Sequence, residues 1–455
     1  MSGQGYVVGM AIATYELTAA IALIVMAKYF LPIFLEKKIY TMPQFLEQRF
    51  DKWVCLVLSL FWVAVYIFIN LTSVLWLGSL AINTLTGFDI SYGLWALVVL
   101  SLAYSLKGGL KAVALTDAIQ VFLLILGGLA VSYIALDQIS NNQGFIQGFQ
   151  IVLTTIPEKF DMILSKDHPS YSDLPGVWVL IGGLWVAHFA YWGFNQYITQ
   201  RALGAKSLPE AQKGVMFAAF LKLLMPIVVV LPGICAVVLI PQLDSPDTAY
   251  PAMMGLLPSG LLGLTFAALI AAIVSSLASM TNSVSTIFTM DIYKQFLSEQ
   301  VDERKLVVVG RNVALISIVV AALCAQPLLG NLESAFQYIQ NFTGFFTPGI
   351  LVIFLVALFW KKATSLSVLV AALASLILSI AMFMFAPDDF PFQHRMGIVF
   401  LVTGFLCYMT ALVQGYTDQE KAVDLNSINF QTSKGFNIST IVILVILIII
   451  YSMWW

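Results

Sequence analysis

Twelve stretches of this 455-residue chain are long and apolar enough to cross a lipid bilayer. A helix needs about 20 predominantly apolar residues to span the hydrocarbon core, and there every backbone polar group must be satisfied within the protein. The sequence therefore predicts an all-α, polytopic membrane protein. The expected spans are residues 8–34, 53–83, 90–106, 114–136, 176–199, 214–241, 259–290, 306–328, 335–360, 365–386, 396–415 and 437–455.

The composition supports this class and argues against others. Only 10% of the residues are charged and 60% are hydrophobic, whereas soluble proteins carry about 25% charged residues. The formal net charge of −2 argues against a nucleic-acid partner. The sequence contains no recognisable metal-ligand cluster, nucleophile motif or phosphate-binding loop, so we do not expect an enzyme.

The basic residues predict how the chain is oriented. If the N-terminus lies outside, eighteen lysines and arginines fall in or beside the inner loops, while the outer loops hold only Lys159, Lys166 and Arg395. Lysine and arginine favour the cytoplasmic side of a membrane. We therefore expect a multi-pass protein of the cell (inner) membrane, in contact with the lipid bilayer, with both ends of this chain outside, on the periplasmic side.

Three ionisable residues lie within the expected spans: Glu16, Asp117 and Lys222. Such residues are costly in hydrocarbon and often functional. Glu16 and Lys222 are compatible with a buried ion pair that joins two helices, or with two groups that line a polar cavity and bind a polar ligand. Asp117 opens its span, so a helix N-cap explains it as well as a functional role does.

The segment VLIGGLWVAHFAYWGFNQYITQ (179–200) contains three glycines, a histidine and an aromatic pair followed by two amides. Transporters interrupt helices at such positions to expose backbone near the bilayer midplane. Tyr191 and Trp192 beside amides suit a sugar, although an interfacial aromatic belt is an alternative. His188 is equally compatible with a helix–helix hydrogen bond.

Amides mark two further places in the spans. The segment ESAFQYIQNFTGFFTPGI (333–350) carries Gln340 one turn after Gln337, a pair that can bracket a ligand or bridge to a neighbouring helix. Gly344 and Pro348 follow and should kink this span. Asn70 is an isolated intramembrane amide, which we interpret as joining two helices.

The run AAIVSSLASMTNS (271–283) places Ala272, Ser275, Ser276, Ser279 and Ser283 on one helical face. Small residues allow close helix packing, which is one interpretation. The other is a site for a monovalent cation such as sodium, built from two adjacent hydroxyls and the carbonyl one turn earlier. Neutral ligands hold such an ion weakly enough to release it, and the lack of a carboxylate in the stripe disfavours a divalent metal.

These motifs carry a family resemblance. The run FAALIAAIVSSLASMTNSVSTIFTMDIYKQF (266–296), with YWGFNQYITQRALGAKS, AAFLKLLMPIVVVLPGI and AFQYIQNFTG, resembles the sodium:solute symporter family, and most of all its bacterial sodium/glucose–galactose cotransporters, over essentially the whole chain. The resemblance implies a LeuT-like fold of two inverted repeats and sodium-coupled sugar symport by alternating access. It implies one transporter domain over 1–455, with the remainder of the first repeat at 8–136, the second repeat at 176–360 and peripheral helices at 365–455.

The resemblance also implies a role for individual residues. The expected sodium ligands are Ala272, Ser275 and Ser276, and Asp117 is expected on the ion's exit route. The expected sugar contacts are Glu16, Lys222 and Gln340, with His188 and Asn70 at the same site. The expected gates are Tyr191 with Trp192 on the inner side, and Met1, Tyr15 and Phe336 on the outer side.

Two features depart from the family pattern. Ala19 and His188 stand where the galactose transporters have serine and asparagine, so another polyol or organic solute is an alternative substrate. The family also has two further spans before the position of Met1, and the second supplies the remaining sodium ligands. We therefore expect the sequence to be N-terminally truncated: either part of a longer transporter or a transport-inactive protein such as a sensor.

Overall fold

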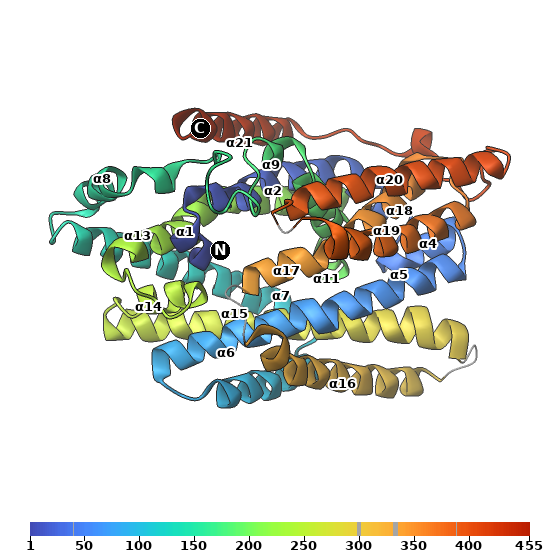
Figure 1. Ribbon diagram of the computed structural model, residues 1–455. Coiled ribbons are helices and arrows are strands. Elements are labelled where there is room, and N and C mark those ends of the chain that lie inside the picture. Colours follow the sequence, from blue (N-terminus) through green and yellow to red (C-terminus); the bar gives the residue numbers. More distant parts are fainter. Residues whose placement is uncertain (40, 298–301, 331–334, 388) are drawn as a thin grey trace.

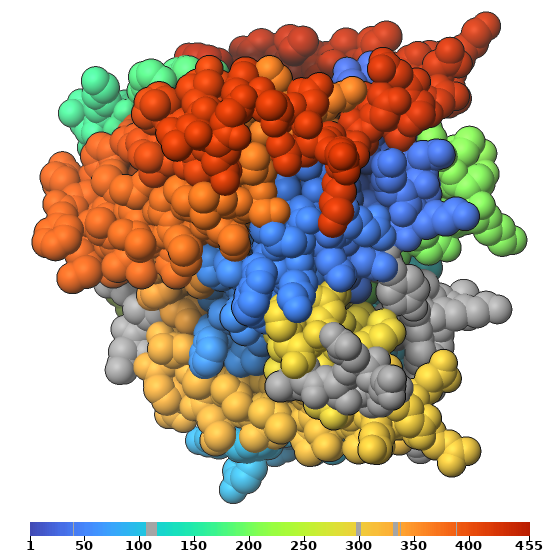
Figure 2. Space-filling model, turned by 90° about the vertical axis from the view of Figure 1, so that its right-hand side faces the viewer, coloured from blue at the N-terminus to red at the C-terminus, as the bar shows by residue number. Residues whose placement is uncertain are grey.

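The computed structural model describes residues 1–39, 41–297, 302–330, 335–387 and 389–455, apart from the side chains of 106–115, 297 and 337. All regular elements in these ranges are helices (Figure 1). The helices α20 and α21 lie along one side of the bundle, and α6, α15 and α16 lie along the opposite side. Turned by 90°, the molecule shows the blue segment around residues 50–70 between the red C-terminal helices and the yellow α15 and α16 (Figure 2).

The first elements are α1 (Ser2–Val7), η1 (Met10–Ala13), α2 (Thr14–Val25), η2 (Met26–Phe30), α3 (Leu31–Glu36), α4 (Met42–Arg49), α5 (Lys52–Ala64), η3 (Val65–Leu71), α6 (Thr72–Thr86), α7 (Ile90–Ile139), α8 (Phe145–Thr155) and η4 (Pro157–Phe160). The middle elements are α9 (Trp178–Ile181), α10 (Leu184–His188), η5 (Phe189–Gly193), α11 (Gln196–Leu203), α12 (Leu208–Met225), η6 (Pro226–Val230), α13 (Leu231–Leu239), η7 (Pro246–Thr248) and α14 (Ala249–Met254). The last elements are α15 (Ser259–Thr286), η8 (Ile287–Leu297), α16 (Glu303–Leu329), α17 (Ala335–Thr343), α18 (Thr347–Phe359), α19 (Ser365–Phe385), α20 (Phe392–Val413), η9 (Leu425–Ser427) and α21 (Lys434–Met453).

Nine of the expected spans are helical stretches long and apolar enough to cross a membrane, counted over the described residues. The other three differ from a straight crossing. Residues 90–105 form a shorter apolar helix, while 176–199 and 335–360 are each broken into pieces.

The element α7 reverses direction, as the two expected spans 90–106 and 114–136 require. The hydroxyl groups of Tyr104 and Thr116 are hydrogen-bonded to each other. Twelve residues of straight helix would separate them by about 18 Å, so the chain turns back between them. On the far side of the turn, Asp117 contacts Ser275 and Gly127 packs against Thr265, so this arm runs antiparallel to α15.

The span at 176–199 breaks at the glycines, which confirms the sequence prediction. Between α9 and α10, the backbone of Gly183 packs directly against the backbone of Gln393 and Gly397 in α20. Glycine allows this approach because a side chain at position 183 would occupy the space of the α20 backbone. A second break follows η5, where Asn195 is extended before α11 begins.

The predicted kink after residue 343 is also confirmed. The helix α17 ends at Thr343, and α18 begins at Thr347 with Pro348 in its first turn. Proline is tolerated there because the first N–H groups of a helix have no partner within it.

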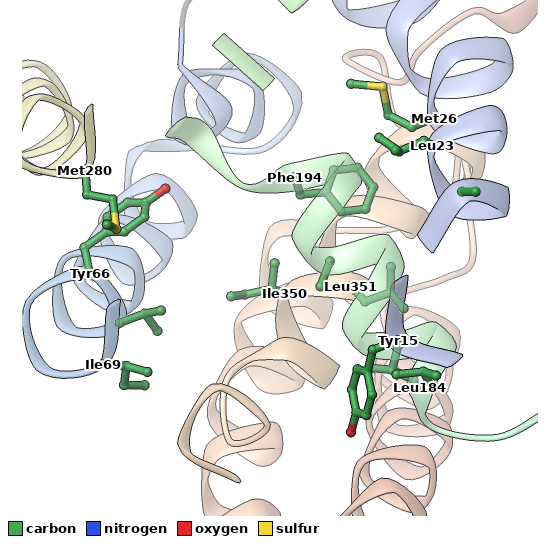
Figure 3. Close-up of a cluster of buried hydrophobic side chains, with 14 of the residues drawn as sticks. Tyr15, Leu23, Met26, Tyr66, Ile69, Leu184, Phe194, Met280, Ile350 and Leu351 are labelled. Carbon is green, nitrogen blue, oxygen red and sulfur yellow. The ribbon is translucent and has the colours of Figure 1, made fainter. Parts of the chain in front are cut away.

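Phe194, between the two pieces of the broken segment, packs into the centre of the core. Its ring stacks on Phe30 with centroids 5.0 Å apart and on Phe354 with centroids 4.4 Å apart. Figure 3 shows it between Leu23 of α2 and Ile350 of α18. Stacked aromatic pairs contribute about 0.5–1.5 kcal/mol each beyond their buried area. The Phe194 ring therefore anchors the break to η2 through Phe30 and to α18 through Phe354.

We expect Gly183→Ala to lower the free energy of unfolding by roughly 1–3 kcal/mol, because the added methyl group overpacks the contact with α20. Thermal unfolding of the purified protein in detergent, followed by tryptophan fluorescence, measures this effect. Gly214→Ala is the control, because nothing lies within 4 Å of a methyl group at this exposed position in α12. Equal melting temperatures for the two variants would contradict the assigned packing.

Candidate functional site

Glu16 and Lys222 form an ion pair between α2 and α12. The Lys222 Nζ lies 2.5 Å from Glu16 Oε2, and their side chains are only 18% and 15% exposed. The same ammonium group lies 4.4 Å from the centre of the Trp192 ring in η5. The pairing expected as one interpretation is thus formed, and it brings three elements together. Removing one partner of a buried pair typically costs about 3–5 kcal/mol, because the other charge is left unpaired.

His188 is buried beside this pair and bonded to α2. Its Nε2 lies 2.7 Å from the hydroxyl of Thr18, which donates its own hydrogen to the Thr14 carbonyl at 2.6 Å. A hydroxyl has a single hydrogen to donate, so the imidazole donates to Thr18 through Nε2–H. The helix–helix hydrogen bond that the sequence left open for His188 is therefore present.

Tyr15, the residue before Glu16, contacts both Phe336 and Gln340. The Tyr15 and Phe336 rings are edge to face with centroids 5.4 Å apart. The Tyr15 hydroxyl accepts a hydrogen bond from Gln393 Nε2 at 3.1 Å and also interacts with the Gln340 side chain. Phe336 and Met1 line a common cavity of about 480 Å³, so the three residues expected at the outer gate are grouped.

The aromatic pair Tyr191 and Trp192 in η5 is held by Tyr197 of α11. The hydroxyl groups of Tyr191 and Tyr197 are hydrogen-bonded, and the Tyr191 and Trp192 rings meet edge to face with centroids 5.0 Å apart. η5 is π-helical, and so is η3, which carries Asn70. π-Helical segments recur at functional sites.

The structure shows no helix–helix hydrogen bond from Asn70 within the part of the chain that it describes. Asn70 is half-buried and has no hydrogen-bond partner among the described residues.

The second cluster forms where α15 crosses α7. Ser275 donates a hydrogen bond to Asp117 Oδ1, and Asp117 Oδ2 lies 2.7 Å from Arg201 Nη2. The same guanidinium donates to the Ser279 hydroxyl at 3.1 Å. Asp117 lies at the start of the second arm of α7, and its carboxylate connects α7, α11 and α15.

The hydroxyl groups on this part of α15 differ in the hydrogen bonds that they already make. Ser275 gives its hydrogen to Asp117, which leaves its oxygen lone pairs free to face a cation. Ser276 is half-buried and has no partner among the described residues. By contrast, Thr281 and Ser283 donate to carbonyls of their own helix at 2.6 and 3.0 Å.

Three contributors were not singled out from the sequence. Arg201 counted only as a charge in an inner loop, and its spacing in the sequence does not indicate its contacts with Asp117 and Ser279. Thr18 follows Glu16 by two residues and looked like an ordinary helix residue. Gln393 precedes the predicted span 396–415, and nothing in the sequence connects it to Tyr15.

Comparison with known proteins bears on this arrangement. The model of the sodium:solute symporter family matches residues 1–377. The chain is 47% identical to the sodium/glucose cotransporter of Vibrio parahaemolyticus, over 100% of this chain and 87% of that protein. It is 29% identical to the human sodium/myo-inositol cotransporter 2, over 84% of this chain and 60% of that protein.

A solved structure of a Na+-coupled sialic acid symporter has the same fold. It superposes with a TM-score of 0.78 at 21% identity, over 92% of this chain and 86% of that one. The match supports the expected LeuT-like fold. This chain therefore belongs to the sodium:solute symporter family: it is a multi-pass membrane transporter, not an enzyme, and it couples the movement of a solute to that of sodium.

Proposed function

We propose that the transported solute is a sugar of the glucose or galactose type, which enters with sodium by alternating access. The observation that carries the proposal is the Glu16–Lys222 pair beneath the Trp192 ring. The 47% identity to a sodium/glucose cotransporter supports the same substrate class.

The chemistry of this pair suits a neutral polyhydroxylated ligand. A sugar hydroxyl can donate to the Glu16 carboxylate and accept from the Lys222 ammonium, and hydrogen bonds to charged groups are about twice as strong as neutral ones. Because the two charges compensate each other, a neutral ligand leaves no net charge buried. Gln340, His188 and Asn70 add polar groups around it, while Trp192 and Tyr191 offer ring faces to the apolar side of a pyranose.

Sodium binds at the α15 stripe in this proposal, with the Ala272 carbonyl and the Ser275 and Ser276 hydroxyls as ligands. The Asp117 carboxylate lies next to Ser275, so an ion that leaves the site meets a negative charge already shared with Arg201. In this proposal Asp117 lies on the ion's route and is not one of the sodium ligands.

Alternating access in this scheme opens the site to one side at a time. Met1, Tyr15 and Phe336 close the outer side, and Tyr191 with Trp192 closes the inner side. The moving parts are the repeat helices within 8–136 and 176–360, with 365–455 peripheral and both ends of the chain outside.

A different polyol or organic solute is the second candidate. The observation that favours it is the His188–Thr18 bond, which fixes a bulky ring where the resemblance predicts a smaller amide. The alternative matches the myo-inositol cotransporter among the relatives.

Uptake into proteoliposomes tests both candidates. The purified protein is reconstituted and offered labelled glucose, galactose, myo-inositol and sialic acid, with an inward gradient of either sodium or potassium. Glucose or galactose uptake that requires sodium supports the proposal. Sodium-dependent uptake of myo-inositol alone favours the alternative, and uptake that is equal in potassium overturns the proposed coupling.

Ser276→Ala removes one proposed sodium ligand. We expect the sodium concentration for half-maximal uptake to rise about tenfold, which corresponds to roughly 1.4 kcal/mol. Ser283→Ala is the matched control, since this hydroxyl bonds to its own helix at Ser279. If the two variants share the wild-type sodium dependence, the ion site lies elsewhere.

Gln340→Ala should weaken sugar binding, because the amide offers both a donor and an acceptor. A loss of about 1–1.5 kcal/mol, or roughly tenfold in apparent affinity, is expected for one hydrogen-bonding side chain. Sugar-dependent uptake at saturating sodium measures it, with Gln150→Ala on the exposed face of α8 as control. Unchanged affinity would remove Gln340 from the sugar site.

A further inference from the structure

A polar cavity of about 580 Å³ lies between the end of the first arm of α7, the last turns of α15 with η8, and α16. It is separate from the Glu16–Lys222 pair and from the Ser275 and Ser276 hydroxyls. Its polar lining consists of Ser105, Asn282, Ser285, Thr286, Thr289 and Arg311.

The hydrogen bonds already made in this cavity leave several N–H and O–H donors without a partner among the described residues. Ser105 donates to Asn282 Oδ1 at 2.6 Å, which leaves the N–H groups of the Asn282 amide. Ser285 donates to the Gly310 carbonyl at 2.8 Å. Thr286 has no hydrogen-bond partner among the described residues.

Thr289 is the strongest indication that a ligand binds. Its side chain is 6% exposed, yet its hydroxyl oxygen has no hydrogen-bond partner among the described residues. Buried hydroxyls are normally bonded. Gly310 keeps the space beside it open, because a methyl group at this position would come within 2.8 Å of the Ser285 hydroxyl and 3.4 Å of the Thr289 hydroxyl.

The charged side chain of the described lining is that of Arg311, which favours an anionic ligand. Arg311 is exposed, forms no ion pair among the described residues, and contributes five N–H donors. The described lining contains no aspartate or glutamate. A guanidinium with convergent hydroxyl and amide donors matches a phosphate group.

The remaining wall indicates where that phosphate comes from. Leu306, Val307 and Ala314 of α16 also line the cavity, and Val307 and Val308 are 53% and 55% exposed on the same helix. The polar floor therefore continues into an apolar surface of a membrane-spanning helix. Arg304 and Lys305 lie exposed in the first turn of α16, next to Asp302 and Glu303, at the end predicted to face the inner leaflet.

We propose that this cavity binds the phosphate headgroup of an anionic phospholipid, with an acyl chain along α16. Arg311 pairs with the phosphate, and Thr289 and the Asn282 amide donate to its oxygens.

Native mass spectrometry of the full chain in detergent, titrated with phosphatidylglycerol, phosphatidylcholine or inorganic phosphate, tests the site. We expect phosphatidylglycerol to bind more tightly than phosphatidylcholine, and Arg311→Gln to weaken its binding about tenfold, in line with the loss of one charge-assisted pair. Arg395→Gln is the matched control, because this arginine lies on α20 over the Phe383 ring. Equal lipid binding by both variants overturns the proposal.

Thr289→Val keeps the side-chain volume and removes the buried hydroxyl. It should weaken phosphatidylglycerol binding while leaving the melting temperature in lipid-free detergent unchanged or higher, which separates loss of the ligand from misfolding. Unchanged lipid binding in Thr289→Val contradicts the assigned contact. If inorganic phosphate displaces the lipid at equal concentration, the ligand is a free anion and the lipid assignment is wrong.

Discussion

Hydrocarbon offers no hydrogen bonds, and this constraint organises the interior of the protein. A polar group in a span is costly unless the protein itself supplies a partner, and three of the costliest side chains find theirs on another helix. Glu16 finds Lys222, Asp117 finds Ser275 and Arg201, and His188 finds Thr18. These pairings favour one rotation of α2, α7, α12 and α15 about their own axes. Apolar contacts alone would specify that rotation less strictly.

The broken helices follow from the same constraint. A break frees backbone groups and is tolerated only where protein surrounds it. At Gly183 the surrounding protein is the backbone of α20, and at Phe194 it is a stack of aromatic rings. The candidate gate residues Tyr191 and Trp192 lie between these two supported points, in a short element whose ends are held and whose middle faces the ion pair.

Much of the candidate site was predictable from the sequence, because charged and strongly polar side chains are energetically costly in a membrane span and are therefore easy to recognise there. Glu16 and Lys222 stood out as expensive charges, and the hydroxyl stripe on α15 stood out by its spacing. The glycine and proline breaks were predictable for the same reason. The sequence could not predict the partners of these residues, because those partners are common residue types at their positions. Thr18 is one of many helical threonines, and Arg201 resembles any basic residue of an inner loop. Pairings across hundreds of residues, such as Gln393 with Tyr15, depend on the tertiary fold. Asp117 was ambiguous because its partners come from α11 and α15, not from its own helix.

The helix α20, which the sequence predicts to be peripheral, is linked to the interior at two points. Within little more than one turn, this helix touches the break at Gly183 through its backbone and holds Tyr15 through Gln393. A hydrogen bond of this kind is lost once its atoms separate by more than about half an ångström beyond contact. Tyr15 therefore cannot swing without either releasing α20 or pulling it along. Gln393 thus ties α20 to Tyr15, a residue of the proposed outer gate, so a movement of that residue would have to involve a helix at the edge of the bundle.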